Sequence, residues 1–225
     1  MRYRAVLFDL DETLFNRTAS LRLFLSDQIS RHAELRFVSS ERWISNFLAL
    51  DKRGRVPKDK VYKMLLKDSD AVDDKFATVL FHEYETMFWR FAQPFHGLER
   101  MFAALKQLSI KTSIVTNGQT HIQLRTLLAL NLDRVVDDYL ISEAVGLRKP
   151  DREIFELAAD RLTVKPHECI FVGDTAATDI VGAQQSGMKG IWFPNGAEWD
   201  VDGSETPDVS ISSLSEVTEL IQRSI

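Results

Sequence analysis

The sequence predicts an α/β fold in which helices cover both faces of a parallel sheet, with an all-helical segment inserted after the first strand. Over residues 94–225, short apolar runs alternate with amphipathic helical patterns, and this alternation is typical of βα units. Residues 16–93 show helical patterns and no convincing strand. A chain of 225 residues is long enough for one large domain that carries a smaller insertion.

The strands expected in the sheet begin with four short apolar runs, each of which stops at a polar residue. "AVLFDLD" stops at Asp9, "TSIVTNG" at Thr116 and "CIFVGD" at Asp174. The weaker run "DYLISEAVG" ends near Ser142, and "GIWFPNG" and "DVSIS" predict two later strands. The helices expected between them span residues 97–108, 119–130, 151–162 and about 176–186. Ligands of such sheets bind at the carboxyl ends of the strands, so these polar residues are candidates for function.

The inserted segment is expected to form helices over residues 20–35, 39–50, 57–68 and 73–92. Ser39 or Ser40, followed by Glu41 and an apolar face, is typical of a helix start. Pro57 indicates another start, because proline is favoured in the first turn of a helix. These patterns predict a core domain of residues 1–15 and 94–225 and a helical domain of residues 16–93.

Composition and charge exclude several classes of function. The formal net charge of −5 gives no general attraction for a nucleic acid polymer, which requires a basic surface. No apolar stretch reaches membrane-spanning length and no signal-like segment opens the chain, so no membrane partner and a cytoplasmic location are expected. Cys169 lies in the apolar run "CIFVG" and is expected to be a buried thiol, and the five histidines show no metal-ligand spacing. A monomer and a homodimer both remain open.

Clustered carboxylates at the strand ends indicate a cation. Asp9 and Asp11 follow the first strand, and Asp174 and Asp179 follow a later one. If these strands are neighbours, up to four carboxylates converge on one edge of the sheet and repel one another. Mg²⁺, which prefers oxygen ligands from a few carboxylates together with waters and a phosphate, fits such a site. Lys149, in the loop "GLRKPD", is a candidate for a second positive charge.

These motifs, in this order, resemble those of the haloacid dehalogenase-like (HAD) superfamily. The first motif of that family, Asp-x-Asp-x-Thr, matches Asp9, Asp11 and Thr13. The second is a Thr or Ser that ends a strand, here Thr116, and the third is a Lys ahead of a helix, here Lys149. The fourth, Gly-Asp followed by a further Asp, matches "GDTAATD" at residues 173–179. The resemblance implies a Rossmann-like three-layer core, and the helical insertion resembles the C1-type cap of the family.

The resemblance also implies a phosphatase mechanism that begins on Asp9. Asp9 would attack phosphorus and form an aspartyl-phosphate. Asp11 would protonate the leaving alkoxide and then take a proton from the hydrolytic water. Mg²⁺ would be held by the carboxylates of Asp9 and Asp174 and by the backbone carbonyl of Asp11.

The remaining motif residues have supporting roles in the implied mechanism. Thr116 and Lys149 would hold the phosphoryl oxygens, and Asn117 would supply a nearby amide. Asp179 would orient Lys149 or a metal-bound water, and Thr13 would support the site from behind. The substrate would be a small phosphorylated metabolite, with nucleoside monophosphates, phosphoglycolate and sugar phosphates all open. Candidate substrate contacts in the helical segment are Arg53, Arg55 and Lys58, in the basic loop "DKRGRVPKDK".

Three alternative functions remain open at the level of sequence. A 2-haloacid dehalogenase is disfavoured by Asp11, because dehalogenase members of the family lack the second Asp and halide leaves without a proton. A phosphomutase would keep Asp9 and Asp11 and would retain its phosphorylated intermediate. A non-enzymatic binding or regulatory protein is expected to have lost some of the charged residues, and all of them are present.

Overall fold

The computed structural model describes residues 3–36, 38–67, 74–202 and 206–223. The chain divides into two compact units, one made of Met1–Asn16 with Pro94–Ile225 and the other of Arg17–Gln93. We call these the sheet unit and the helical unit. No helix in the described ranges has both the length and the apolar character that crossing a membrane requires.

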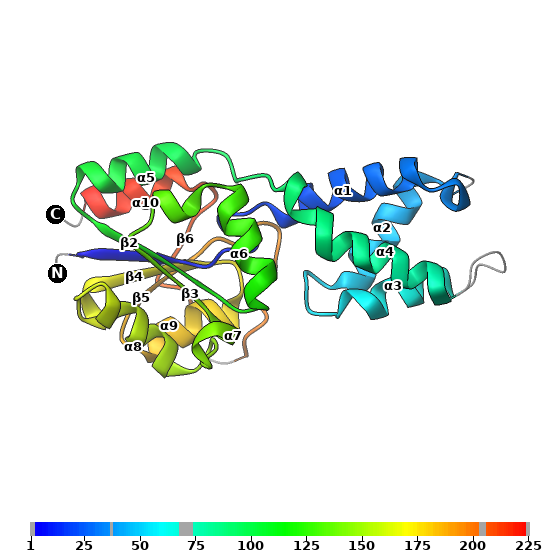
Figure 1. The fold of residues 1–225 in the computed structure, drawn as a ribbon. Helices are drawn as coiled ribbons and strands as arrows, with labels where there is room; N and C mark the ends of the chain where they lie inside the picture. The colour runs from blue at the N-terminus through cyan, green and yellow to red at the C-terminus, as the bar shows by residue number, and fades with distance from the viewer. Residues whose placement is uncertain (1–2, 37, 68–73, 203–205, 224–225) are drawn as a thin grey trace. The chain divides into compact units, whose positions relative to one another are not determined.

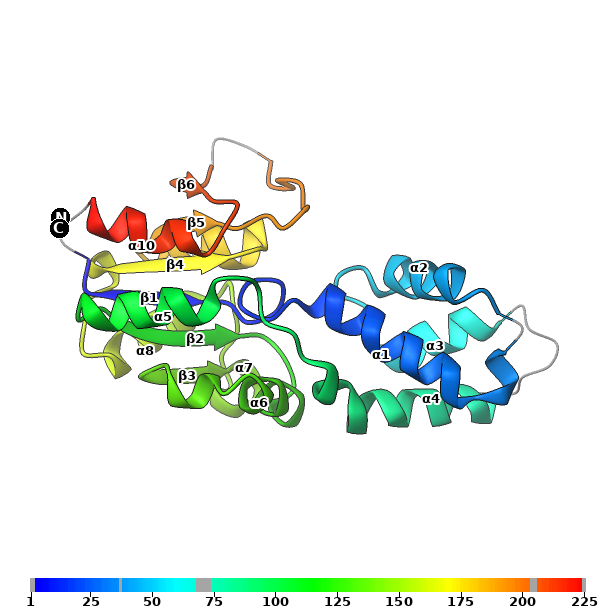
Figure 2. The ribbon, with the colours of Figure 1, turned by 90° about the horizontal axis from the view of Figure 1, so that it is seen from above.

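The sheet unit is built on a six-stranded parallel sheet with strand order β3-β2-β1-β4-β5-β6 (Figure 2). The strands are β1 (Ala5–Phe8), β2 (Lys111–Thr116), β3 (Asp138–Ile141), β4 (Cys169–Gly173), β5 (Lys189–Trp192) and β6 (Val209–Ser210). The chain proceeds from β1 outwards through β2 and β3, and then returns to the other side of β1 at β4. The boundary between β1 and β4 is therefore the topological switch point, where ligands of open α/β sheets bind.

Helices cover both faces of this sheet, so the prediction of a parallel α/β fold is confirmed (Figure 1). The sheet unit contains α5 (Leu98–Gln107), α6 (Thr120–Ala129), α7 (Ser142–Val145), α8 (Arg152–Arg161), α9 (Gly182–Gln185) and α10 (Ser215–Gln222). Helices α5 and α10 lie on one face of the sheet, and α8 and α9 lie on the opposite face (Figure 1). All four residues of β1 are buried, as expected for a central parallel strand that is covered on both sides.

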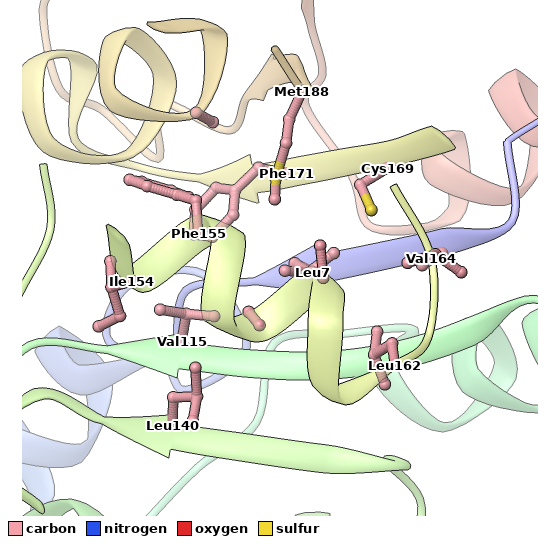
Figure 3. Packing of buried hydrophobic residues seen from close by; sticks show 14 residues of the cluster. Leu7, Val115, Leu140, Ile154, Phe155, Leu162, Val164, Cys169, Phe171 and Met188 are labelled. Carbon is pink, nitrogen blue, oxygen red and sulfur yellow. The ribbon is translucent and has the colours of Figure 1, made fainter. Parts of the chain in front are cut away.

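One large apolar cluster fills the space between α8 and the sheet (Figure 3). Ile154 and Phe155 of α8 pack over Leu7 of β1, Val115 of β2 and Phe171 of β4. The rings of Phe155 and Phe171 meet edge to face with centroids 5.1 Å apart, a favourable aromatic geometry. Cys169 belongs to the same cluster, and burial raises the pKa of its thiol to about 12. The thiol is thus a buried apolar group, as its sequence context indicated.

The helical unit consists of α1 (Arg17–Arg31), α2 (Ser40–Asp51), α3 (Lys58–Leu66) and α4 (Asp74–Met87), with short 3₁₀ turns at Ala33–Leu35 and Phe88–Phe91. No strand occurs in its described residues, 17–36, 38–67 and 74–93. Ser39 caps α2 by accepting a hydrogen bond from the amide of Arg42, which confirms the helix start expected there. Phe24 of α1 lies at the centre of an aromatic core with Tyr84, Phe88 and Phe91. The expected helix ends at residues 68 and 73 lie outside the described residues.

Three features of the sheet unit differ from the sequence prediction, the first being the short helix α7, which was not expected after β3. The segment expected as an α-helix over about 176–186 begins as a π-helix, Ala176–Val181, and becomes α-helical only in α9. Helix α10 was not predicted, although Val217 and Ile221 are four residues apart and both buried. The π-helical turn carries Asp179, and such turns occur often at functional sites.

Candidate active site

The sheet brings three of the predicted motifs together at its carboxyl edge. The amide of Asp9 donates to the carbonyl of Val172 over 2.9 Å, so the chain after β1 stays alongside β4. Asp174 directly follows β4, and Thr116 is the last residue of β2 on the other side of β1. Side chains that are far apart in the sequence therefore lie close to the topological switch point.

The centre of the site is a group of three buried carboxylates. Asp9, Asp174 and Asp179 each offer one carboxylate oxygen, and these oxygens lie within 4.8 Å of one another. Burial raises the pKa of Asp9 well above its ordinary value, and the neighbouring carboxylates raise it further while the ammonium of Lys149 lowers it. The fold thus holds the three acids together against their mutual repulsion.

Lys149 supplies a positive charge inside this group. Its ammonium lies 2.6 Å from Asp9 Oδ1 and 2.8 Å from Asp179 Oδ1, and the side chain is only 2% exposed. The same nitrogen stands 5.2 Å from the centre of the Phe171 ring, within cation–π range. Burial alone would lower the pKa of Lys149, but the charges of Asp179 and Asp9 outweigh it and the pKa lies above its ordinary value. Lys149 is therefore protonated throughout the physiological range.

Asp179 is held in place by the turn that follows β4. Its Oδ2 accepts a hydrogen bond of 3.0 Å from the amide of Thr175, and its Oδ1 faces Lys149. Its side chain packs directly on Gly173, where a Cβ atom would overlap the Asp179 carboxylate. Glycine is thus required at position 173 by close approach rather than by a special backbone angle. With both oxygens engaged, Asp179 has the geometry of a residue that orients Lys149.

Asn117 anchors the loop that carries Lys149. Its Nδ2 donates to the carbonyl of Lys149 over 2.8 Å, and its Oδ1 accepts from the amide of Lys149 over 2.9 Å. The side chain of Asn117 therefore serves the Lys149 backbone. Thr116 Oγ1 and Thr13 Oγ1 are buried, and within the described part of the chain neither hydroxyl makes a hydrogen bond. A buried hydroxyl without a partner is costly, so Thr116 at the strand end suits a ligand contact.

Asp11 lies just beyond β1 and contacts a residue that the sequence analysis did not single out. Gln123, in the first turns of α6, donates from Nε2 to Asp11 Oδ2 over 2.7 Å and to the carbonyl of Asn117 over 3.1 Å. The position of Gln123, seven residues after Thr116, offered no signal by itself, because a glutamine near the start of a helix is usually solvated.

Two further contacts of the site were also missed. Asn195, after β5, donates to Glu12 Oε2 over 2.7 Å, and Glu12 is buried with a left-handed φ of 60°. The indole nitrogen of Trp192 donates to the carbonyl of Asp174 over 2.9 Å. Trp192 and Asn195 both lie in a segment whose sequence is typical of an ordinary strand followed by a polar loop. Only the fold shows that they contact the site.

The basic loop of the helical unit is organised by a buried carboxylate. Asp51 receives two hydrogen bonds from the guanidinium of Arg17, at 2.7 and 3.0 Å, and an ion pair from Lys58. The ammonium of Lys58 also donates to the carbonyl of Val56 over 2.6 Å. Of the three candidate substrate contacts, Lys58 is thus engaged within the unit. The side chains of Arg53 and Arg55 are exposed and also interact with neighbouring groups.

Comparison with known proteins places the chain in a family. A family model described as haloacid dehalogenase-like hydrolase matches residues 3–187. The chain belongs to the haloacid dehalogenase-like hydrolases. It is 29% identical to the glyceraldehyde 3-phosphate phosphatase of Pyrococcus furiosus over 99% of this chain and 94% of that protein.

Solved structures of haloacid dehalogenase-like hydrolases show the same fold. The putative HAD-hydrolase YfnB of Bacillus subtilis, solved with bound magnesium, superposes with a TM-score of 0.73 at 25% identity and covers 98% of this chain and 99% of its own. The 2-haloacid dehalogenase of Pseudomonas syringae pv. tomato gives a TM-score of 0.62 at 28% identity, with 98% and 99% covered.

As a haloacid dehalogenase-like hydrolase, the protein has a donor set that fits a divalent cation. When all three acids are ionised, the buried carboxylates of Asp9, Asp174 and Asp179 face one ammonium, which leaves two negative charges in excess. Hard oxygen ligands and this excess charge suit Mg²⁺. The site therefore offers the ligand atoms and the excess negative charge that a divalent cation requires.

Proposed function

We propose that the protein is a Mg²⁺-dependent phosphatase that hydrolyses small phosphomonoesters through an aspartyl-phosphate on Asp9. The observation that carries this proposal is the position of the Asp9 carboxylate, which lies 2.6 Å from the Lys149 ammonium and within 4.8 Å of the Asp174 carboxylate. A carboxylate so placed is next to one positive charge and to a second oxygen ligand for Mg²⁺, and an incoming phosphoryl group needs both cations.

In the first step, a carboxylate oxygen of Asp9 attacks phosphorus as the bond to the ester oxygen breaks. Asp11, in its protonated form, gives its proton to that departing oxygen, so the alcohol leaves neutral. Lys149 and the hydroxyl of Thr116 hold the non-bridging oxygens and balance their charge. The products of this step are the free alcohol and a phosphoryl group on Asp9.

In the second step, Asp11 takes a proton from a water molecule that attacks the phosphorus of the aspartyl-phosphate. The bond between phosphorus and Asp9 breaks, and inorganic phosphate leaves. Asp9 is again a carboxylate and Asp11 is again protonated, so the cycle closes.

Mg²⁺ would be held by the carboxylates of Asp9 and Asp174 and by the backbone carbonyl of Asp11. When bound, it supplies positive charge that neutralises the phosphoryl oxygens and reduces the repulsion between Asp9 and the substrate. Asp179 keeps Lys149 oriented, at 2.8 Å, and takes no ligand position in this proposal.

For the substrate, we favour a small sugar phosphate, with glyceraldehyde 3-phosphate first. The relative from Pyrococcus furiosus carries the name of that activity and matches nearly the full length of both chains. Nucleoside monophosphates and phosphoglycolate stay in the panel of candidates. We further propose that the helical unit is a cap that closes over the site, and that Arg53 or Arg55 contacts the non-reacting part of the substrate.

The test is a panel of phosphomonoesters assayed with Mg²⁺ and then with excess EDTA. We expect phosphate release that requires Mg²⁺, with glyceraldehyde 3-phosphate among the better substrates. Absence of turnover on every ester, in a folded sample, would contradict the proposal and favour a binding protein. A requirement for a sugar bisphosphate activator would indicate a phosphomutase instead.

The dehalogenase reaction is the second candidate, because one solved relative carries that name at 28% identity. Asp11 and Asp174 count against it, since halide needs no proton and that reaction needs no metal. Halide release from a 2-haloacid in the presence of EDTA, without phosphatase activity, would favour it.

A further inference from the structure

We propose that Gln123 is a positioning residue, which holds the carboxyl group of Asp11 in the orientation required for proton transfer to the leaving group. This inference rests on the proposed phosphatase function. Gln123 lies outside the sequence motifs, yet its side chain is 6% exposed and its amide nitrogen donates to Asp11 Oδ2 over 2.7 Å.

The geometry of the Gln123 amide explains how it fixes Asp11. An amide nitrogen carries two hydrogens. One of them points to the carbonyl of Asn117, at 3.1 Å, and the other to Asp11. The bond to the backbone fixes the plane of the amide, so the direction of the second N–H is fixed as well. Asp11 is thereby tied to the same backbone segment as Thr116 and Asn117.

The surrounding chain is built to accept this side chain. Gln123 lies on α6. Its backbone N–H donates to the carbonyl of Gln119 over 3.0 Å, so the side chain starts from a regular helix. Gly118 faces it, and a Cβ atom at position 118 would lie 2.7 Å from Gln123 Nε2. A side chain at position 118 would displace the amide. A functional group held by a helix and a close-packed neighbour is positioned more accurately than one on a free loop.

Positioning of a general acid has a specific kinetic signature. The proton from Asp11 is needed when the leaving group is an alkoxide, which is a poor leaving group in its anionic form. A nitrophenolate is a stable anion and leaves without that proton. A change that only misorients Asp11 therefore slows the cleavage of alkyl esters and leaves the cleavage of aryl esters nearly unchanged. A change that disturbs packing or phosphate binding slows both.

The experiment compares Gln123→Met with the parental protein and with Gln107→Met, which makes the same change at an exposed position at the end of α5. Formation of the phosphoenzyme is measured by rapid quench in Mg²⁺, with glyceraldehyde 3-phosphate and with 4-nitrophenyl phosphate. For Gln123→Met we expect the rate constant with the alkyl ester to fall on the order of 10- to 100-fold. With the aryl ester we expect a change of less than about threefold, and KM for either ester stays close to the parental value.

Gly118→Ala is the second variant, because it displaces the Gln123 amide without removing it. We expect the same selective loss with the alkyl ester. The melting temperature of Gln123→Met stays close to that of the control, whereas that of Gly118→Ala falls, because φ is 157° at position 118 and a side chain is strained there. Equal losses with both esters, or a parental rate with the alkyl ester, would overturn the role of Gln123. If the parental protein forms no phosphoenzyme with either ester, the proposed function fails first and this inference fails with it.

Discussion

Asp9 and Lys149 form a buried ion pair in which each partner also faces a second carboxylate. Lys149 contacts both Asp9 and Asp179, and Asp9 also faces Asp174. The proposed nucleophile Asp9 is thus kept close to positive charge, and it shares that charge with Asp179.

The first prediction at the residue scale concerns Asp11. Asp11→Asn keeps the backbone carbonyl and removes the group that gives and takes the proton. We expect phosphatase turnover to fall by about 10²- to 10⁴-fold, while Mg²⁺ still raises the melting temperature as in the parental protein. Turnover of phosphate esters at the parental rate would show that Asp11 has another role.

The second prediction concerns the charge on Lys149. Lys149→Met leaves Asp9 and Asp179 buried without their shared cation, and breaking a buried ion pair in this way costs about 3–5 kcal/mol. We expect a lower free energy of unfolding in denaturant and a loss of activity. Lys106→Met, at an exposed position on α5, is the matched control and should change neither quantity. An unchanged unfolding free energy for Lys149→Met would contradict the buried network.

At the scale of elements, the helical unit has its own buried charge network, which is centred on the last residue of α2. Asp51, the last residue of α2, binds Arg17 at the start of α1 and Lys58 at the start of α3. Gly54 donates its amide to the same carboxylate over 2.7 Å, with a φ of 89° that favours glycine. A single carboxylate thus connects three helices and shapes the basic loop between α2 and α3.

This network predicts how stability depends on pH. Burial would raise the pKa of Asp51, but Arg17 and Lys58 outweigh it, and the pKa lies below its ordinary value. The unfolded chain therefore binds the proton more tightly, so the stabilisation is present above about pH 4 and is lost as pH falls through the folded pKa. We expect Asp51→Asn to lower the unfolding free energy at neutral pH by about 3–5 kcal/mol. The unfolding free energy of this variant should also fall less than that of the parental protein as the pH is lowered.

The matched control for this prediction is Asp133→Asn, an exposed aspartate in the sheet unit. It should follow the parental pH dependence in denaturant titrations at each pH. If Asp51→Asn and the parental protein lose stability equally between pH 5 and pH 2, the Asp51 network does not contribute as described.

Some helices and strands could be predicted from the sequence and others could not, and the difference has physical reasons. Strands such as β1 and β4 are continuous apolar runs, and α5, α6 and α8 have apolar faces at helical spacing, so their existence could be read from the pattern. The π-helical turn at Ala176–Val181 could not, because its apolar residues fit an ordinary α-helix equally well. The distinction depends on tertiary contacts of Asp179 with Gly173 and Thr175.

For the molecule as a whole, the motifs converge because the strand order places β1 between β2 and β4. The meeting of Asp9 with Asp174, and the position of Thr116 at the same edge of the sheet, could be anticipated, since carboxyl ends of neighbouring parallel strands share an edge. The contacts of Gln123 with Asp11 and of Asn195 with Glu12 could not. Their partners are 112 and 183 residues away, and no local pattern indicates such pairs.

The fourth prediction concerns the metal and applies to the whole protein. A ligand that binds only the folded state stabilises it by about 2.7 kcal/mol at a concentration of 100 times its Kd. We expect Mg²⁺ to raise the melting temperature of the parental protein in a concentration-dependent manner, and EDTA to reverse the effect. Asp174→Asn should abolish the response. The same variant should melt no lower than the parental protein in EDTA, because it relieves repulsion on Asp9. A full Mg²⁺ response in Asp174→Asn would exclude Asp174 as a ligand.

The central claim, that Asp9 carries the phosphoryl group, is tested most directly by trapping the intermediate. The parental protein and Asp11→Asn are mixed with labelled glyceraldehyde 3-phosphate or 4-nitrophenyl phosphate and Mg²⁺, quenched in acid, digested and mapped by mass spectrometry. For Asp11→Asn with 4-nitrophenyl phosphate, whose leaving group needs no proton, the account predicts up to one labelled phosphoryl group per chain on the peptide that contains Asp9, because hydrolysis of the intermediate needs Asp11. This label is lost on treatment with hydroxylamine and is absent from Asp9→Asn. A label on another residue, or turnover with no covalent label at any time, would contradict it.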